Sequence, residues 1–112
     1  MTEYNVTKEA EFDALPWDDN KILVLFTAPT WCIPCQRLEP HWNKLKDLYD
    51  NIIFVTVDMG SFPEDMDSHW ASERFNILGV PQLKLAMGYE IEPVDIKSRA
   101  VVPLIKELSQ YV

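Results

Sequence analysis

The sequence contains little cysteine, little glycine and little positive charge. Its 112 residues include two cysteines and three glycines, and 10 basic residues stand against 18 acidic ones, which gives a formal net charge of −8. Secreted scaffolds held together by disulfides normally carry more cysteines, spread along the chain, so this class is disfavoured. The acidic excess repels nucleic acid and anionic membranes, and we expect neither as a partner.

The sequence also lacks a secretion signal and a long apolar run. The N-terminus, MTEYNVTKEAEF, has no basic start and no apolar stretch followed by a small-residue cleavage site. No run reaches the roughly 20 apolar residues that are needed to cross a bilayer. We therefore expect a cytoplasmic protein. In that reducing compartment, a close pair of cysteines indicates a redox site or a metal site.

The composition supplies a hydrophobic core. Hydrophobic residues make up 47% of the chain and aromatic residues 12%, which is enough for the core of one domain spanning residues 1–112. Continuous apolar runs bounded by turn residues predict buried strands. The predicted strands are residues 22–26, 52–57, 82–86 and 91–95, with a hairpin turn at residues 87–90 before the last one.

The longest predicted helix runs from about residue 32 to residue 49. Apolar side chains at spacings of four, three and four form its buried face: Leu38, Trp42, Leu45 and Tyr49. Pro34 falls in the first turn, where its missing N–H leaves no hydrogen bond unmade. Pro40 lies inside the helix, where it removes a hydrogen bond and predicts a kink.

Three shorter helices complete the predicted fold. They cover residues 8–15 with Thr7 as the cap, residues 68–75 after an irregular stretch at 59–67, and the C-terminus from about residue 100. The buried side of the last helix is expected to consist of Val102, Ile105, Leu108 and Val112. The order of strands and helices predicts an α/β fold, with a central mixed β-sheet flanked by helices on both faces.

The segment Trp31-Cys32-Ile33-Pro34-Cys35 contains the reactive groups. Two residues at i and i+3 of a helical turn have Cβ atoms roughly 5–6 Å apart, and a modest adjustment allows a disulfide. Cys32 follows a strand and opens a helix, so its sulfur should lie near unpaired N–H groups that favour the thiolate. We predict a dithiol/disulfide cycle in which Cys32 is the nucleophile and the less exposed Cys35 is the resolving thiol.

A zinc site is the alternative use of the cysteine pair. Four-ligand zinc sites need two further ligands, and the candidates are His41 and His69. His41 lies nine residues after Cys32 on the same predicted helix and should face away from it. Nothing in the sequence directs His69 to the pair. We therefore expect no metal and no cofactor other than the redox-active Cys32–Cys35 disulfide.

Over nearly its whole length the chain resembles the thioredoxin family. The family's buried strand, its Trp-Cys-x-Pro-Cys motif and its kinking proline are matched by residues 22–26, residues 31–35 and Pro40. The family's cis-proline is matched by Pro81, which follows Val80. The resemblance implies a thioredoxin fold in which Pro81 is cis and sits against the two sulfurs. The Val80 backbone would then be free to pair with an extended substrate segment.

The same resemblance implies a function. It indicates a thiol–disulfide oxidoreductase that reduces protein disulfides and is recharged by a reductase or by a small thiol. An apolar docking patch is expected around Cys32, formed by Trp31, Ile33, Pro34, Val80 and Pro81. We expect the protein to act as a monomer.

The chain departs from the family near the second cysteine. The family's buried aspartate is replaced by Leu25 or Phe26, depending on the placement of a one-residue gap, and its partner lysine is lost, with Phe54 nearby. Losing both charges together avoids a lone buried ion, which would be costly. Our hypothesis is that proton transfer to Cys35 uses water or Asp58.

Three further departures concern the surroundings of the site. Ile33 stands between the cysteines where the family usually has glycine, which adds apolar bulk to the docking patch. The family's glycine after the last strand has no match at residues 95–98. Residues 59–75 are longer than the family's usual connection, and a plain surface excursion is favoured over a partner contact.

Two other functions stay open from the sequence. One is a glutaredoxin-like electron carrier that uses glutathione, although the Ile-Pro dipeptide between the cysteines argues mildly against it. The other is a non-catalytic thioredoxin-like binding subunit, which would use residues 59–75 and would need neither thiol. The retained cysteine motif disfavours that purely structural role.

Overall fold

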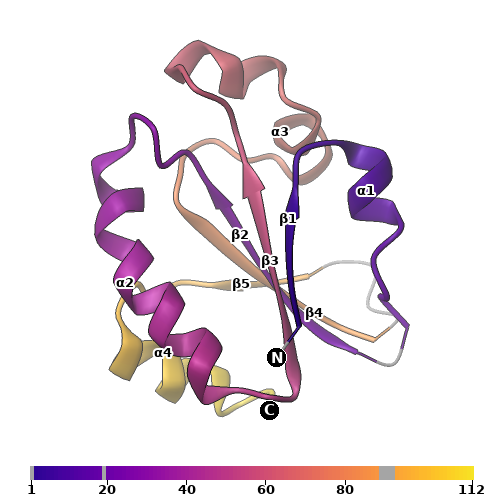
Figure 1. Ribbon diagram of the computed structural model, residues 1–112, viewed down its shortest axis with the longest axis vertical. Helices are drawn as coiled ribbons and strands as arrows, with labels where there is room; N and C mark the ends of the chain where they lie inside the picture. Colours follow the sequence, from indigo (N-terminus) through magenta and orange to yellow (C-terminus); the bar gives the residue numbers. More distant parts are fainter. Residues whose placement is uncertain (1, 19, 89–92) are drawn as a thin grey trace.

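The computed structural model describes residues 2–18, 20–88 and 93–112, which form a mixed five-stranded sheet with helices on both faces (Figure 1). The elements are β1 (Thr2–Val6), α1 (Glu9–Asp13), β2 (Lys21–Thr27), α2 (Ile33–Leu48), β3 (Ile52–Asp58), the 3₁₀ helix η1 (Pro63–Ser68), α3 (Trp70–Phe75), β4 (Gln82–Met87), β5 (Val94–Ile96) and α4 (Val101–Leu108). The predicted α/β architecture is confirmed.

The sheet has the strand order β1-β3-β2-β4-β5. Strands β1, β3 and β2 are parallel, whereas β4 runs antiparallel to β2 and β5 runs antiparallel to β4. The central strand β2 is buried on both sides of the sheet, as its continuous apolar run predicts. Because side chains alternate along a strand, Leu23 and Leu25 enter one core while Val24 and Phe26 enter the other.

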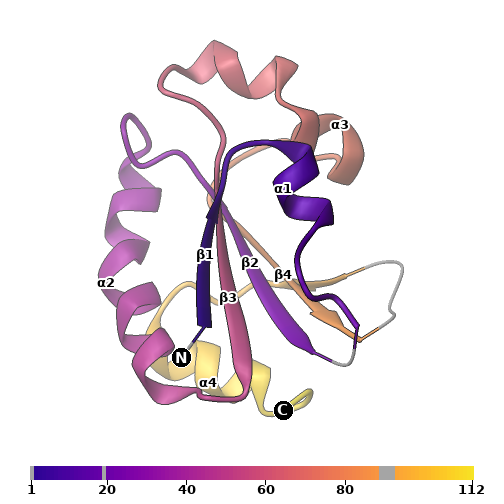
Figure 2. The ribbon, with the colours of Figure 1, turned by 45° about the vertical axis from the view of Figure 1, so that its right-hand side comes forward.

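Two helical layers cover the sheet. Helices α2 and α4 lie on one face and α1 and α3 on the other, as Figures 1 and 2 show. The first core lies beneath α2 and α4 and is built from Leu23, Leu25, Leu38, Trp42, Leu45, Ile52, Phe54, Leu83, Leu85, Ile96, Leu104 and Leu108. The apolar face predicted for the long helix is confirmed, since Leu38, Trp42 and Leu45 are buried here and Tyr49 packs against them.

Strand β1 was not predicted from the sequence. Its residues, Thr-Glu-Tyr-Asn-Val, contain no apolar run, and of those whose burial is described only Val6 is buried. The strand lies at the edge of the sheet and pairs in parallel with β3 alone. An edge strand of this kind depends on its partner for its conformation, so the local sequence carries little signal.

The buried face predicted for the last helix is wrong in part. Val102 is 75% exposed and Ile105 is partly exposed, whereas Leu104 and Leu108 are fully buried. Both sides of α4 carry apolar residues, so the angle at which the helix docks on the sheet selects the side that is buried. Val112 does pack against the first core, as expected.

The shorter elements begin or end at different residues than predicted. Helix α1 starts at Glu9 with Lys8 rather than Thr7 as the N-cap. The Glu11 carboxylate accepts hydrogen bonds from the Thr7 and Lys8 N–H groups, which moves the start of the helix inward. The stretch expected to be irregular contains η1, and α3 begins only at Trp70. The predicted hairpin turn and the start of its second strand fall partly on residues 89–92, outside the described residues.

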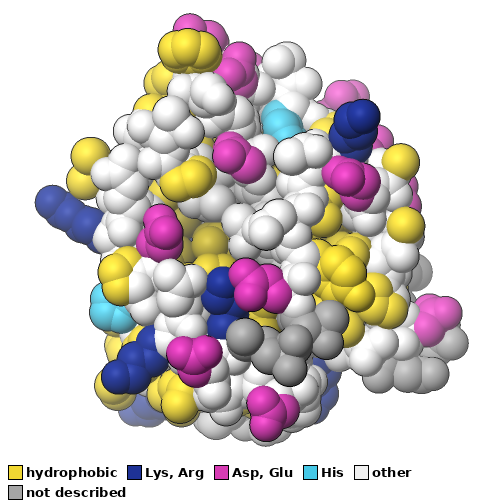
Figure 3. Space-filling model, viewed as in Figure 1, with side chains coloured by type: hydrophobic (Ala, Val, Ile, Leu, Met, Phe, Trp, Pro, Cys, Tyr) yellow, Lys and Arg dark blue, Asp and Glu magenta, His cyan; other side chains and the backbone are white. Residues whose placement is uncertain are grey.

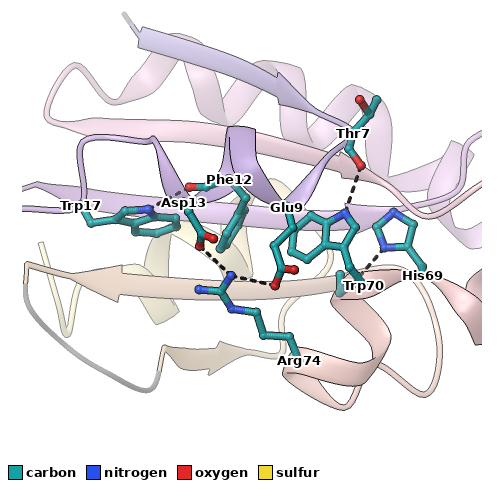
Figure 4. A network of polar contacts seen from close by, with 9 residues as sticks. Thr7, Glu9, Phe12, Asp13, Trp17, His69, Trp70 and Arg74 are labelled. Carbon is teal, nitrogen blue, oxygen red and sulfur yellow. Dashed lines mark hydrogen bonds and ion pairs between the residues drawn. The ribbon is translucent and has the colours of Figure 1, made fainter.

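Arg74 joins α3 to α1. Its guanidinium forms ion pairs with Asp13 at 2.6 Å and with Glu9 at 3.2 Å (Figure 4). It also lies over the rings of Phe12 and Phe75. Because all the charged partners are partly exposed, the ion pairs contribute only modestly to stability, and the contacts with the two aromatic rings add to them.

A second set of contacts fixes the long segment that follows β3. The Trp70 indole N–H donates to the Thr7 carbonyl oxygen at 3.0 Å (Figure 4). The His69 ring caps α3 by accepting a hydrogen bond from the Ala71 N–H. Met59, Trp70, Ala71 and Phe75 therefore anchor this segment on the second core, whereas residues 61–65 between them are exposed.

One alanine substitution on the predicted buried face of α4 and one on the observed buried face test how the helix docks on the sheet. Leu104→Ala should lower the free energy of unfolding by about 2–5 kcal/mol, because it leaves a cavity in the core. Val102→Ala should change it by no more than about 0.5 kcal/mol, since that side chain is exposed. Urea denaturation followed by tryptophan fluorescence measures both variants, and equal losses would contradict the observed docking.

Candidate active site

The two cysteines form a disulfide at the start of α2. Strand β2 ends at Thr27, and the Cys32 N–H then donates to the Ala28 carbonyl oxygen, which closes the turn before the helix. Cys32 is the N-cap residue of α2, and its sulfur is bonded to that of Cys35, with 5.2 Å between the two Cα atoms. The spacing of three residues in a helical turn therefore permits the bond, as predicted.

The Cys32 sulfur lies at the positive end of a helix. Its Sγ accepts a hydrogen bond from the Cys35 N–H at 3.2 Å, one of the backbone donors that a helix start leaves unpaired. The same N–H and the helix dipole stabilise negative charge on Cys32 once the disulfide is reduced. The expected electrostatic setting of the first cysteine is thus present.

The disulfide is covered more evenly than expected. Cys32 is 5% exposed and Cys35 is 3% exposed, and both contact buried Ala28 and the partly buried Trp31 and Val80. The position of Cys35 one turn inside the helix predicts a less exposed second cysteine. In the oxidised protein the two differ little, because both sulfurs face the same junction between strand and helix.

Of the five residues predicted for the docking patch, Trp31 and Val80 pack against the two cysteines. The Val80 carbonyl oxygen lies 3.6 Å from Cys32 Sγ, and the Val80–Pro81 peptide bond is cis, as the family resemblance implied. Ile33 is 53% exposed and Pro34 is also exposed, so the segment between the cysteines presents an apolar surface to solvent. Trp31 is half-buried beside them.

Trp31 is held by the loop after β3. Its indole N–H donates to the Gly60 carbonyl oxygen at 3.2 Å. Gly60 has φ +121°, and a Cβ at this position would collide with the side chain of Asp65. Glycine is therefore the residue that adopts this backbone conformation without strain. The turn at Gly60 places its carbonyl oxygen where it accepts the hydrogen bond that orients Trp31.

A pocket with both polar and apolar side chains lies behind Cys35, between α2 and the strands β1, β2 and β3. It has a volume of about 190 Å³ and is lined by Glu3, Asn5, Leu25, Thr27, Pro29, Cys35, Glu39, Trp42, Asn43, Lys46 and Thr56. Figure 3 shows this face hollowed beside α2, with hydrophobic side chains at its floor. The buried Trp42 indole N–H has no hydrogen-bond partner among the described residues. The polar side chains of the lining and the volume suit ordered water.

The structure decides between the two residues that were candidates for the aspartate position. Leu25 lines the pocket behind Cys35, whereas Phe26 belongs to the opposite core. Across the parallel pair, Leu25 lies opposite Thr56, and Phe54 lies opposite Leu23. The position next to the lost aspartate is therefore occupied by threonine rather than by phenylalanine.

The structure does not bring Asp58 to Cys35. The Asp58 carboxylate accepts a hydrogen bond from the Gly60 N–H at 2.9 Å, and Asp58 is not among the residues that line the pocket behind Cys35. It lies near His69 instead. Burial lowers the pKa of His69 below its usual value, and contacts with Asp58 offset this only in part.

Glu39 is not among the residues predicted from the sequence, although it lines the pocket behind Cys35. It lies four residues after Cys35 on α2 and shares the pocket with it. Residues at i and i+4 lie on the same side of a helix, so this spacing was the available signal. The other carboxylate of the pocket, Glu3, is ion-paired to Lys46 at 2.7 Å.

The described residues contain no cluster of three potential metal ligands. The His41 ring accepts a hydrogen bond from the Val101 N–H at 3.2 Å, and His69 caps α3. In the same part of the chain, no helix is long and apolar enough to span a membrane.

The amino-acid sequence of the chain is similar to the sequences of known thioredoxins. The family model described as Thioredoxin matches residues 3–108. Thioredoxin 1 of Plasmodium falciparum is 31% identical over 80 residues, which cover 71% of this chain and 70% of that protein. Mouse thioredoxin is 38% identical over 59 residues, which cover 53% of this chain and 56% of the relative. The match thus spans little more than half of the mouse protein.

Solved structures show the same fold. The reduced thioredoxin pre-protein of Schistosoma mansoni superimposes with a TM-score of 0.76 over 100% of both chains, at 22% sequence identity. At that identity the likeness concerns the backbone arrangement alone. It agrees with the strand order and the two helical layers described above.

The placement of Glu39 predicts a difference between two carboxylate variants. Reduced protein mixed with 5,5′-dithiobis(2-nitrobenzoate) releases one thionitrobenzoate when Cys32 attacks and a second when Cys35 displaces it. Glu39→Gln should slow the second phase about tenfold near neutral pH, which is less than the 100-fold or more typical of a direct general base, because water in the pocket also accepts the proton.

Asp58→Asn is the matched control, since it removes one carboxylate away from the pocket. Both phases should keep their wild-type rates and pH dependence in this variant. A second phase slowed by Asp58→Asn and untouched by Glu39→Gln would return the proton transfer to Asp58.

Proposed function

The chain belongs to the thioredoxin family, and from the cysteine pair at the start of α2 we infer that it is a thiol–disulfide oxidoreductase acting on protein disulfides. The observation that carries this inference is the placement of Cys32. Its sulfur is bonded to Cys35 and receives a backbone N–H at the N-terminus of the helix. That arrangement supports a cycle between a dithiol and a disulfide.

Cys32 begins the cycle as a thiolate. It attacks one sulfur of the substrate disulfide, so that a mixed disulfide forms and the first substrate thiolate leaves. Cys35 then loses its proton and attacks Cys32 Sγ, which forms the Cys32–Cys35 bond and releases the second substrate thiolate. The substrate disulfide gains two electrons and the cysteine pair loses two. A reductase or a small thiol returns them, and no other cofactor takes part.

The docking patch holds the substrate in this cycle. Ile33 and Pro34 give an exposed apolar surface beside the disulfide, and Trp31, Val80 and Pro81 continue it. The Val80 backbone lies next to Cys32 and is placed to pair with an extended segment of the substrate. Backbone pairing would recognise many substrates, because it reads no particular side chain.

We also propose the domain organisation, the oligomeric state, the location and the partners of the protein. Residues 1–112 act as one domain, since both cores pack on the same sheet. The protein works as a monomer in the cytoplasm, where a reducing environment keeps the thiols available. Its acidic net charge supports neither a nucleic-acid partner nor an anionic membrane.

The glutaredoxin-like alternative is not favoured. The family match is to thioredoxins over residues 3–108, and the Ile33-Pro34 dipeptide agrees with this. A purely structural binding subunit would not need the bonded cysteine pair. Activity with a thioredoxin reductase should therefore exceed activity with glutathione and glutathione reductase.

Reduction of insulin by dithiothreitol tests the proposed cycle. The wild-type protein should accelerate insulin precipitation, and Cys32→Ser should abolish the acceleration because the nucleophile is absent. Pre-reduced Cys35→Ser, mixed with insulin after the dithiothreitol is removed, should instead accumulate a mixed disulfide visible on a non-reducing gel, because the resolving thiol is missing. Full activity of the Cys32→Ser variant, with a native circular dichroism spectrum, would refute the proposed roles.

A further inference from the structure

A pocket with cationic side chains opens beside the redox site. It has a volume of about 290 Å³ and is lined by Pro34, Arg37, Leu38, His41, Pro81 and Arg99. Pro34 lies between the two cysteines, and Pro81 follows Val80, whose carbonyl oxygen is 3.6 Å from Cys32 Sγ. The pocket therefore adjoins the docking patch. Its two arginines and one histidine are notable because the chain carries a net charge of −8.

The backbone holds two of these side chains in place. The Arg99 guanidinium donates to the carbonyl oxygens of Ile96 at 2.7 Å, Ser98 at 2.9 Å and Pro81 at 3.3 Å. The His41 Nδ1 accepts the Val101 N–H, so the other ring nitrogen is the donor in the neutral ring. A guanidinium fixed in this way loses little conformational freedom when it binds an anion.

No carboxylate of the described residues neutralises the two arginines. Within the described residues, the ion pairs involve Lys46, Arg74 and Lys84. Neither Arg37 nor Arg99 lies within 4.0 Å of a described acidic group. The Glu107 carboxylate attracts the Arg99 guanidinium electrostatically, but only from beyond ion-pair distance. The same carboxylate accepts hydrogen bonds from the Lys97 and Ser98 N–H groups. The positive charge at the pocket is therefore available to a ligand.

We propose that this pocket binds a carboxylate of the substrate, namely an aspartate or glutamate side chain close to the disulfide that Cys32 attacks. Guanidinium groups bind carboxylates through charge-assisted hydrogen bonds. The pocket shares Pro81 with the docking patch, so a polypeptide lying along the patch reaches both sites. This inference rests on the proposed function and gives it a preference that backbone pairing at Val80 does not supply.

The proposed source of the carboxylate is a polypeptide rather than a small thiol. The apolar surface at Ile33, which is 53% exposed, suits the side chains of a protein substrate. The carboxylates of a small thiol such as glutathione have the same chemistry. The experiment therefore includes both sources.

Changing one charge on the enzyme and one charge on the peptide substrate, separately and together, tests the site. Two disulfide peptides, identical except for Glu or Gln beside one cysteine, are reduced by wild type, Arg37→Glu and Lys44→Glu, and kcat/KM is measured for each pair. Lys44 is the matched control because it is exposed on the same helix, outside the pocket, and gives the same change in net charge. The change in the net charge of the protein is thus equal in both variants, and only its position differs.

Arg37→Glu should lower the ratio of Glu-peptide to Gln-peptide reduction by about fivefold, and Lys44→Glu by less than about twofold. Equal losses in the two variants would overturn the proposal, as would no loss in either. A wild-type protein that reduces neither peptide would refute the proposed function instead, which keeps the two failures distinct.

Glutathione disulfide and its tetraethyl ester form the second arm. If Arg37→Glu impairs reduction of glutathione disulfide relative to the ester but leaves the peptide ratio unchanged, the carboxylate comes from a small thiol and the polypeptide assignment is overturned. If the peptide ratio falls as expected, the assignment stands whatever the result with glutathione disulfide.

Discussion

The hydrogen bond from the Cys35 N–H to Cys32 Sγ joins the fold to the chemistry. It exists because Cys32 caps α2, and α2 begins there because β2 ends five residues earlier. A thiolate at this position receives a backbone donor and the field of the helix at once. The same geometry holds the second sulfur one turn away, within reach of the first. Attack and resolution therefore need no large movement of the chain.

The two cores hold this junction rigid. Helix α2 is fixed from below by Leu38, Trp42 and Leu45, which pack on the sheet. The opposite face of β2 is covered by α1 and α3, which are joined by Arg74 (Figure 4). Because β2 and β3 are parallel, their carboxyl ends meet at one edge of the sheet, where Gly60 orients Trp31. The site thus lies where parallel strands end, the usual place for sites in α/β sheets.

The first turns of α2 carry charges of opposite sign on different sides. Arg37 lines the pocket beside Pro81, and Glu39 lines the pocket behind Cys35. Two residues along a helix are separated by about 200° of rotation, so adjacent parts of one sequence serve two surfaces. In the proposed cycle one surface faces the substrate, and the other adjoins the resolving thiol. The charge pattern is therefore local, and the net charge of the whole chain does not describe it.

The elements with a local signal could be predicted from the amino-acid sequence. The continuous apolar run of β2 predicts burial on both faces, and the cysteine spacing predicts a disulfide at the start of a helix, because each depends on a few consecutive residues. Edge strand β1 and the buried side of α4 depend on docking against distant residues. The pocket that unites Arg37 with Arg99, and the separation of Asp58 from Cys35, likewise arise from contacts between separate elements. These features could be seen only once the chain was folded, since no local pattern encodes the position at which two elements meet.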